Sequence, residues 1–175
     1  MSHARRGGAL ALFTLVCAGC TSAHTVPVAP SVDLPRFMGD WYVIANIPTP
    51  PEKGAHNAVE SYRLAPDGTV ATTFTFREDG FDGPLKTMKP RGFVRPGTQN
   101  AVWGMQFVWP IKAEYVIAHV DADYRETIIA RSRRDYVWIM ARTPVIPDAD
   151  YARLAQRVRE MGYDVAKLQK VPQRW

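Results

Sequence analysis

The chain has 175 residues, of which 46% are hydrophobic, and it carries a formal net charge of +5. This length and apolar content suit a single domain with a hydrophobic core. Lysine and arginine residues are scattered along the chain rather than gathered in one dense run. The composition therefore argues against a nucleic-acid-binding surface, and we expect no nucleic-acid partner.

The first 19 residues have the pattern of a secretion signal. Arg5 and Arg6 supply a positively charged start. The apolar stretch 9–16 that follows is too short to span a bilayer as a mature helix. We therefore expect residues 1–19 to be a signal peptide that is removed from the mature protein.

The signal is followed by Cys17-Ala18-Gly19-Cys20, which resembles the lipobox of bacterial lipoproteins, although Cys17 stands where leucine is usual. The resemblance implies that Cys20 is acylated and becomes the first residue of the mature chain. Thr21, in place of an aspartate, then suggests the outer membrane, with the protein on its periplasmic face. Ordinary signal cleavage near Ala23 is the alternative.

Removal of Cys17 and acylation of Cys20 would leave no free cysteine. The fold then has no disulfide, and a thiol enzyme or a cysteine-ligated zinc site is excluded. We expect no metal and no cofactor. Residues 20–34 are predicted to be the acylated N-terminus and a proline-rich linker, in which Val26 to Pro30 favour an extended spacer. A short helical turn is predicted over 33–38.

Strand-like runs alternate with turns from residue 41 to residue 142. Pro90 interrupts one run, where we expect a bend or bulge. Eight antiparallel strands of this length suit an all-β up-and-down barrel with one ligand cavity. The expected strands are 41–47, 58–64, 69–76, 86–94, 101–108, 113–120, 126–131 and 136–142.

The C-terminal region predicts a helix over 147–161. Pro147 suits its first turn, Gly162 can cap its end, and Leu154 and Val158 lie on one apolar stripe. A last edge strand is expected within 164–171.

Three short motifs stand in order along the chain: Gly39-Asp40-Trp41, then Asp121 to Tyr124, then the run 135–144 that contains Arg142. Together they resemble the lipocalin family. The likeness is closest to its bacterial outer-membrane lipoproteins, with the apolipoprotein D and plant temperature-induced lipocalin groups as relatives. The resemblance covers about 33–171 of a domain that we place at 35–175. It implies that Arg142 packs over Trp41 in a cation–π contact at the closed end of the barrel, and that the C-terminal helix packs outside.

Strand side chains alternate between faces, so the motif residues and the family resemblance set which side chains point inward. Ala45, Leu64 and His119 are also expected to face inward. We expect an apolar interior with Glu60, Tyr115 and Tyr136 at the mouth, which suits an amphiphile with its chain down and its head group at the opening. The predicted ligand-binding residues are Val43, Glu60, Tyr62, Phe74, Phe76, Met88, Met105, Phe107, Tyr115, Ile117, Tyr136, Trp138 and Met140.

Glu60 is the most informative of these residues, because burying a carboxylate in an apolar cavity costs free energy unless it is paired or solvated. One interpretation is that it meets a cationic or hydroxyl-bearing head group, with Tyr115 and Tyr136 as aromatic neighbours. The other is that it reaches water at the rim or pairs with Lys53. For His119, near the base, a structural hydrogen bond and a ligand role both stay open.

No catalytic constellation is visible, because neither His56 nor His119 has a matched nucleophile. The hypothesis is a non-enzymatic, outer-membrane-anchored lipocalin. It binds fatty acids or lysophospholipids and stores or transports them in envelope maintenance or stress. The alternatives are a barrel enzyme, a haem binder that uses His119, another hydrophobic small-molecule binder, or a scaffold with a filled interior. The oligomeric state, including a homodimer, is left open.

Overall fold

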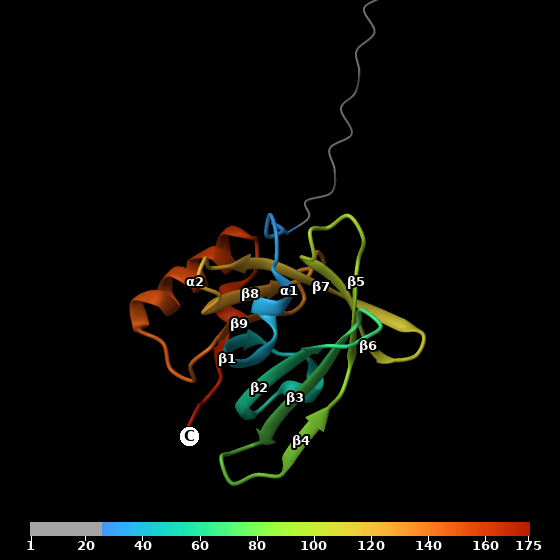
Figure 1. Ribbon diagram of the computed structural model, residues 1–175. Helices are drawn as coiled ribbons and strands as arrows, with labels where there is room; N and C mark the ends of the chain where they lie inside the picture. Colours follow the sequence, from blue (N-terminus) through green and yellow to red (C-terminus); the bar gives the residue numbers. More distant parts are fainter. Residues whose placement is uncertain (1–25) are drawn as a thin grey trace, which may run out of the picture.

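The computed structural model describes residues 26–175 as an antiparallel β-barrel with one long helix on its outside (Figure 1). The predicted signal peptide and Cys20 lie outside the described residues. Within 26–175, no helix is long and apolar enough to cross a bilayer. The elements in chain order are α1 (Leu34–Phe37), β1 (Gly39–Ile47), the 3-10 helix η1 (Pro50–Glu52), β2 (Ala55–Leu64), β3 (Val70–Glu78), β4 (Leu85–Met88), β5 (Arg91–Val94), β6 (Val102–Val108), β7 (Ile111–Val120), β8 (Glu126–Ala130), β9 (Val137–Ala141), α2 (Asp148–Glu160), the 3-10 helix η2 (Val165–Lys167) and β10 (Gln169–Lys170).

Neighbouring strands pair in the order β10-β1-β2-β3-β5-β6-β7-β8-β9, and β1 also pairs with β9, which closes the barrel. The predicted eight-stranded up-and-down barrel is confirmed. Its fourth strand is split into β4 and β5 at Lys89 and Pro90, as the proline predicts, because proline has no N–H for the ladder. Strand β4 pairs with β3, whereas β6 pairs with β5.

The base of the barrel is closed by α1, which places the Phe37 ring against Trp41 and Trp103 at centroid distances of 5.0 and 5.6 Å. Asp33 begins this helix, and its carboxylate accepts a hydrogen bond from the Arg36 N–H at 3.2 Å. The predicted helical turn over 33–38 is therefore present. The opposite end, where β1, β3, β6 and β8 finish, is the mouth.

Side chains alternate as predicted along β3, where Val70, Thr72, Phe74 and Phe76 are all buried. Within residues 26–175 the register shifts at four β-bulges or irregularities, and two of them bear on the predicted faces, one between Val43 and Ala45 in β1 and one between Ile117 and His119 in β7. Because a bulge adds one residue, every side chain beyond it changes face.

The bulges overturn two predictions and one strand end overturns a third. Ala45 packs in the cluster between the barrel wall and α2, not inside the barrel, and the following residue, Asn46, turns inward. His119 also faces outward, where it borders a surface groove together with Arg153 and Arg157 of α2. Leu64, at the end of β2, is 41% exposed and does not line the interior.

Helix α2 packs on the outside of the barrel, as predicted (Figure 1). Leu154 and Val158 are fully buried against the outer faces of β8 and β9, where they contact a cluster that includes Ile128 and Ile139. Each such side chain stabilises the docked helix by about 1.5–3 kcal/mol. The last strand, β10, pairs with β1, so the predicted edge strand is present but short.

Residues 26–33 do not form the free spacer that was predicted for this part of the linker. Val26 and Val32 are buried, and the backbone N–H groups of Ala29 and Val32 donate hydrogen bonds to the carbonyl oxygens of Ile117 and Gln99, both at 2.9 Å. The valine side chains bury apolar surface against the barrel, which outweighs the extended preference of the prolines. The folded domain therefore begins at or before Val26.

Candidate ligand cavity

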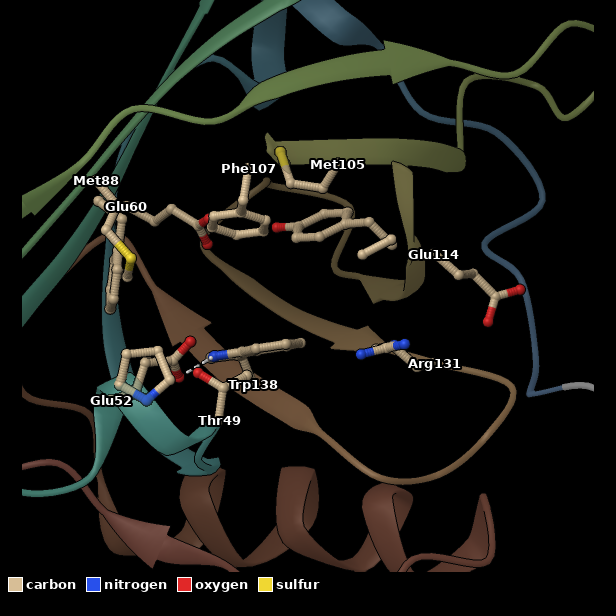
Figure 2. A pocket seen from close by; sticks show the side chains of 13 residues that line it. Thr49, Glu52, Glu60, Met88, Met105, Phe107, Glu114, Arg131 and Trp138 are labelled. Atoms are coloured by element: carbon tan, nitrogen blue, oxygen red, sulfur yellow. Dashed lines mark hydrogen bonds between the residues drawn. The ribbon is translucent and has the colours of Figure 1, made fainter. Parts of the chain in front are cut away.

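A cavity of about 360 Å³ lies in the mouth half of the barrel (Figure 2). This volume falls within the range of about 300–1,000 Å³ that is typical of small-molecule sites. Its lining is predominantly apolar, with four charged side chains among it. The lining residues are Thr49, Pro51, Glu52, Glu60, Phe74, Met88, Met105, Phe107, Ala113, Glu114, Tyr115, Arg131 and Trp138.

The floor of the cavity is made by Glu60 and Tyr115. Glu60 stands opposite Trp41 in the β1–β2 ladder, and Tyr115 stands opposite Trp103 in the β6–β7 ladder. Below them the interior is filled. The Trp103 and Tyr115 rings stack at 5.4 Å, and the Tyr62 and Tyr115 hydroxyl groups contact each other.

Glu60 lies deep in the barrel and is only 8% exposed. The pKa of its carboxyl group is raised to about 7, mainly by burial and in part by the nearby charge of Glu52, whereas hydrogen bonding with Tyr62 and Tyr115 opposes the rise. Near neutral pH the group is therefore divided between its charged and neutral forms. The prediction that Glu60 reaches water at the rim or pairs with Lys53 is wrong, because Lys53 is exposed and makes no ion pair with this buried group.

Glu52 is a second buried carboxyl group, and the sequence did not single it out. It lies in η1, within the loop after β1, and accepts a hydrogen bond from Trp138 Nε1 at 2.9 Å (Figure 2). It also accepts a hydrogen bond from Asn46 Nδ2 at 3.1 Å. Burial raises its pKa, although these donors and Thr49 act against the rise. Asn46 can make its bond only because the bulge in β1 turns it inward.

The walls between the floor and the rim are apolar. Phe74, Met88 and Met105 form the middle of the cavity, and Phe107 at the rim is 54% exposed. From there the β6–β7 hairpin continues outward through the exposed residues Val108, Trp109 and Ile111.

Two further charged residues, Glu114 and Arg131, line the cavity away from Glu52 and Trp138 (Figure 2). Glu114 accepts hydrogen bonds from the Ser132 N–H at 2.7 Å and the Ser132 hydroxyl at 3.0 Å. Arg131 Nε lies 3.4 Å from an Asp135 carboxylate oxygen. Both side chains thus have partners of their own outside the cavity.

The predicted ligand-binding residues divide into two groups. Those that the structure brings to the cavity are Glu60, Phe74, Met88, Met105, Phe107, Tyr115 and Trp138. Those that pack in the surrounding core instead are Val43, Tyr62, Phe76, Ile117 and Met140. Tyr136 does neither, because its ring packs beside Arg131.

The predicted depth was wrong for Glu60 and Tyr115, which lie at the floor and not at the mouth. Alternation tells which face a side chain takes, but its height depends on the register with the neighbouring strand. The deep end of the cavity therefore carries a carboxyl and a phenol group, in addition to the polar residues nearer the mouth. Residues that sequence reasoning missed are Thr49, Pro51, Glu52, Ala113, Glu114 and Arg131.

No histidine of residues 26–175 lines the cavity. His119, the residue named for haem ligation, points outward because of the bulge in β7, and its Nε2 is buried without a hydrogen-bond partner. Its pKa is lowered, mainly by burial and then by Arg157 and Arg153. His56, at the start of β2, packs edge-on against Phe81 in the loop between β3 and β4.

The motif residues meet at the base. The Arg142 guanidinium carbon lies 3.8 Å from the Trp41 ring centroid, which is the contact that the resemblance implies. Gly39, at φ +93°, adopts a left-handed conformation that favours glycine, and a Cβ there would lie 3.4 Å from Arg142 Nη1. Arg142 also donates hydrogen bonds to the carbonyl oxygens of Arg36, Phe37, Met38, Asp40 and Tyr124.

The base turn between β7 and β8 is held by Asp121, whose carboxylate accepts hydrogen bonds from the N–H groups of Arg125 and Glu126, both at 2.6 Å. The Tyr124 hydroxyl in the same turn accepts a hydrogen bond from the Asp33 N–H at 2.7 Å. These residues position the closed end of the barrel and do not reach the cavity.

A closed eight-stranded barrel, sealed at its base by a helix and hollow near its mouth, defines the class of barrels that hold a small molecule inside. A family model described as a lipocalin-like domain matches residues 32–173. The chain therefore belongs to the lipocalin family, as its motifs indicate.

Relatives with this fold come from plants and bacteria. Temperature-induced lipocalin-1 of Arabidopsis thaliana is 29% identical over 169 residues, which cover 87% of this chain and 86% of that protein. The outer membrane lipoprotein Blc of Escherichia coli K12 is 28% identical over 161 residues, with 90% and 88% of the two chains covered. Among solved structures, insecticyanin of the tobacco hornworm Manduca sexta matches with a TM-score of 0.65 at 15% identity, over 84% of this chain and 83% of its own. That likeness is one of fold.

Proposed function

We propose that the protein binds single-chain lipids, fatty acids or lysophospholipids, in the cavity, and stores or carries them for envelope maintenance or stress. The observation that carries the proposal is the hollow of about 360 Å³ walled by Phe74, Met88 and Met105. Each methylene group of an alkyl chain buried there would contribute roughly 0.8 kcal/mol. Flexible methionine side chains can adapt to chains of different shape. Lipocalin relatives are binding proteins for hydrophobic small molecules, which supports a carrier and not a catalyst.

We infer also that Cys20 is acylated and anchors the protein to the periplasmic face of the outer membrane. The small residues before Cys20 support this, as does the relative in Escherichia coli that is named an outer membrane lipoprotein. The packed domain begins by Val26, six residues after Cys20. An extended chain spans at most about 3.6 Å per residue, so the barrel would lie within about 20 Å of its anchor.

Ligand binding is tested by titrating the delipidated protein with a fluorescent fatty acid and a fluorescent lysophospholipid. We expect saturable binding for the wild type. Ala113→Trp places an indole in the cavity and should weaken binding about tenfold or more. Ala152→Trp, on the exposed side of α2, is the matched control and should bind as the wild type does. Wild-type protein that binds neither probe would refute the proposed function.

Anchoring is tested separately, by growing cells that produce the full chain with radiolabelled palmitate and separating their membranes. We expect label on the wild type and recovery in the outer-membrane fraction. Cys20→Ser should abolish both, whereas Cys17→Ser should leave both unchanged because Cys17 is removed with the signal. Loss of the label in Cys17→Ser but not in Cys20→Ser would contradict acylation at Cys20. A wild-type protein without label would contradict it as well.

A further inference from the structure

The cavity holds two buried carboxyl groups without a cationic partner. Glu52 and Glu60 are 7% and 8% exposed, and both line the hollow. Among residues 26–175, no lysine, arginine or histidine forms an ion pair with either one. A buried carboxylate without a counter-charge is costly, so a ligand that supplies one would relieve that cost.

The remaining groups around these acids do not supply a positive charge. Glu52 accepts from Trp138 and Asn46, which are neutral donors. Glu60 faces only the hydroxyl groups of Tyr62 and Tyr115 and the charge of Glu52. Arg131, the one basic residue on the lining described here, lies 3.4 Å from Asp135 and belongs to the rim.

Aromatic rings complete a setting that favours a cation. Trp138 and Phe74 line the same hollow as the two acids, and the Tyr115 ring forms part of its floor. Ring faces attract an ammonium group, and the attraction is stronger where water is excluded. Carboxylates, hydroxyl groups and ring faces together match the head of an organic amine and repel a carboxylate.

The gradient of polarity fixes an orientation. Glu60 lies at the floor and Glu52 reaches the cavity from η1, whereas on the side of β4 and β6 the path toward the mouth runs past Met88, Met105 and Phe107. That path continues over the exposed hairpin residues Val108 and Trp109. An alkyl chain would therefore find apolar contacts on the way out of the barrel rather than at its floor.

We propose that the cavity takes amphiphiles head first, with an ammonium head group between Glu60 and Glu52 and the alkyl chain directed along Met105 and Phe107 to the mouth. This inference rests on the proposed lipid-binding function and narrows its ligand class. Single-chain lipids with an amine-bearing head bind best, and fatty acids, whose carboxylate would meet two carboxyl groups, bind least well. It reverses the chain-down orientation that alternation alone predicts.

The first test compares three probes of equal chain length, dodecylamine, dodecanol and dodecanoate, as competitors of the neutral fluorophore N-phenyl-1-naphthylamine on the delipidated wild type at pH 7.5. We expect dodecylamine to displace the fluorophore at a concentration about tenfold or more below that of dodecanoate, with dodecanol between them. Dodecanoate that competes as well as dodecylamine would overturn this inference and leave the proposed function standing. If no probe and no lipid bound, the proposed function itself would fail.

The second test assigns the preference to the two acids. Glu60→Gln and Glu52→Gln keep size and hydrogen bonding but remove the charge, so each should bring the dodecylamine midpoint close to that of dodecanol. Glu160→Gln is the matched control, because this carboxylate is exposed on α2, outside the barrel, and does not line the cavity. An amine preference that survives in both variants, or that vanishes in the control, contradicts the proposal. The wild-type probe series stands even if one variant fails to fold.

Discussion

The two ends of this barrel are built from the same strands but are packed in opposite ways. At the base, Phe37 meets Trp41, Tyr62 and Trp103 with ring centroids 5.0–5.6 Å apart, and no space is left for a ligand. Near the mouth, Phe74, Met88 and Met105 surround a hollow of about 360 Å³. The alternative of a scaffold with a filled interior would require packing along the whole barrel, whereas only the base half is filled. The packed base stabilises the fold, whereas the side chains around the cavity can be suited to a ligand without loss of that packing.

Truncation of a phenylalanine to alanine should lower the unfolding free energy more at the base than near the mouth. Phe37 is fully buried among aromatic rings, so Phe37→Ala should lose about 3–5 kcal/mol of unfolding free energy. Phe74 borders the hollow and has fewer neighbours to lose, so Phe74→Ala should cost about 2 kcal/mol. Urea denaturation of both variants measures the difference. Equal losses would mean that the hollow is as tightly packed as the base.

Arg142 is expected to have the next largest effect. Arg142→Met keeps apolar contact with Trp41 but removes hydrogen bonds to five backbone carbonyl groups, among them those of Phe37 and Asp40 at 3.2 and 2.8 Å. Unpaired carbonyl groups at a sealed base should cost about 3 kcal/mol. Arg95→Met, at an exposed arginine, is the control and should change stability little. A loss for Arg142→Met no greater than the control's would show that α1 seals the base unaided.

Glu60, in the cavity near the mouth, should make the stability of the protein depend on pH. Glu60 has a pKa of about 7 in the folded protein against an ordinary value of 4.5, so the unfolded chain releases its proton more readily. This contribution to the free energy of unfolding is complete below about pH 4.5 and is lost as the pH rises through 7. It corresponds to on the order of 3 kcal/mol. Glu52, Tyr62 and Tyr115 are the titratable groups that face Glu60.

Glu60→Gln removes this dependence, so the variant should gain stability relative to the wild type between about pH 5 and about pH 8. Urea denaturation of both proteins at the two pH values gives the comparison. Glu114→Gln should show no such gain, because hydrogen bonds from Ser132 hold that carboxylate. A difference between Glu60→Gln and the wild type that stays constant with pH would place the Glu60 charge in contact with water.

The base was predictable from the sequence and the mouth was not, for physical reasons. Gly39, Trp41 and Arg142 act through local conformation and one contact, so their spacing in a familiar motif was enough to place them. The faces of β3 were also predicted correctly, since β3 alternates without interruption between Val70 and Phe76. Strand number and the outer helix follow from the same periodicities.

In β1 and β7 the prediction failed where one extra residue changed the register. His119 and Ala45 were assigned to the wrong face because a bulge leaves no clear mark in the alternation of a single sequence. Glu52 was missed because a loop has no periodicity from which to infer its direction. Glu60 was assigned to the correct face but to the wrong depth, since only its pairing with Trp41 fixes its height.

The smallest predicted effect lies at the junction of the two halves. The β1–β2 ladder stops at Tyr42 and Val59, and beyond it the Gln173 side chain donates hydrogen bonds to the carbonyl oxygens of Val43 at 2.9 Å and Ala58 at 3.2 Å. The C-terminal segment thus takes the place of the missing pairing between the strands. Gln173→Ala should cost about 1–2 kcal/mol by leaving both carbonyl groups unpaired.

The control for this junction is Gln156→Ala, which removes only exposed side-chain hydrogen bonds to Glu160 and Arg159 on α2 and should cost a few tenths of a kcal/mol. Hydrogen exchange locates the effect of Gln173→Ala, and we expect faster exchange in β1 beyond Val43 with little change at Trp41. This outcome would follow because the filled base holds its own end of β1, whereas the hollow half depends on the C-terminal segment. Faster exchange that spreads evenly along β1 would mean that the two halves unfold as one unit.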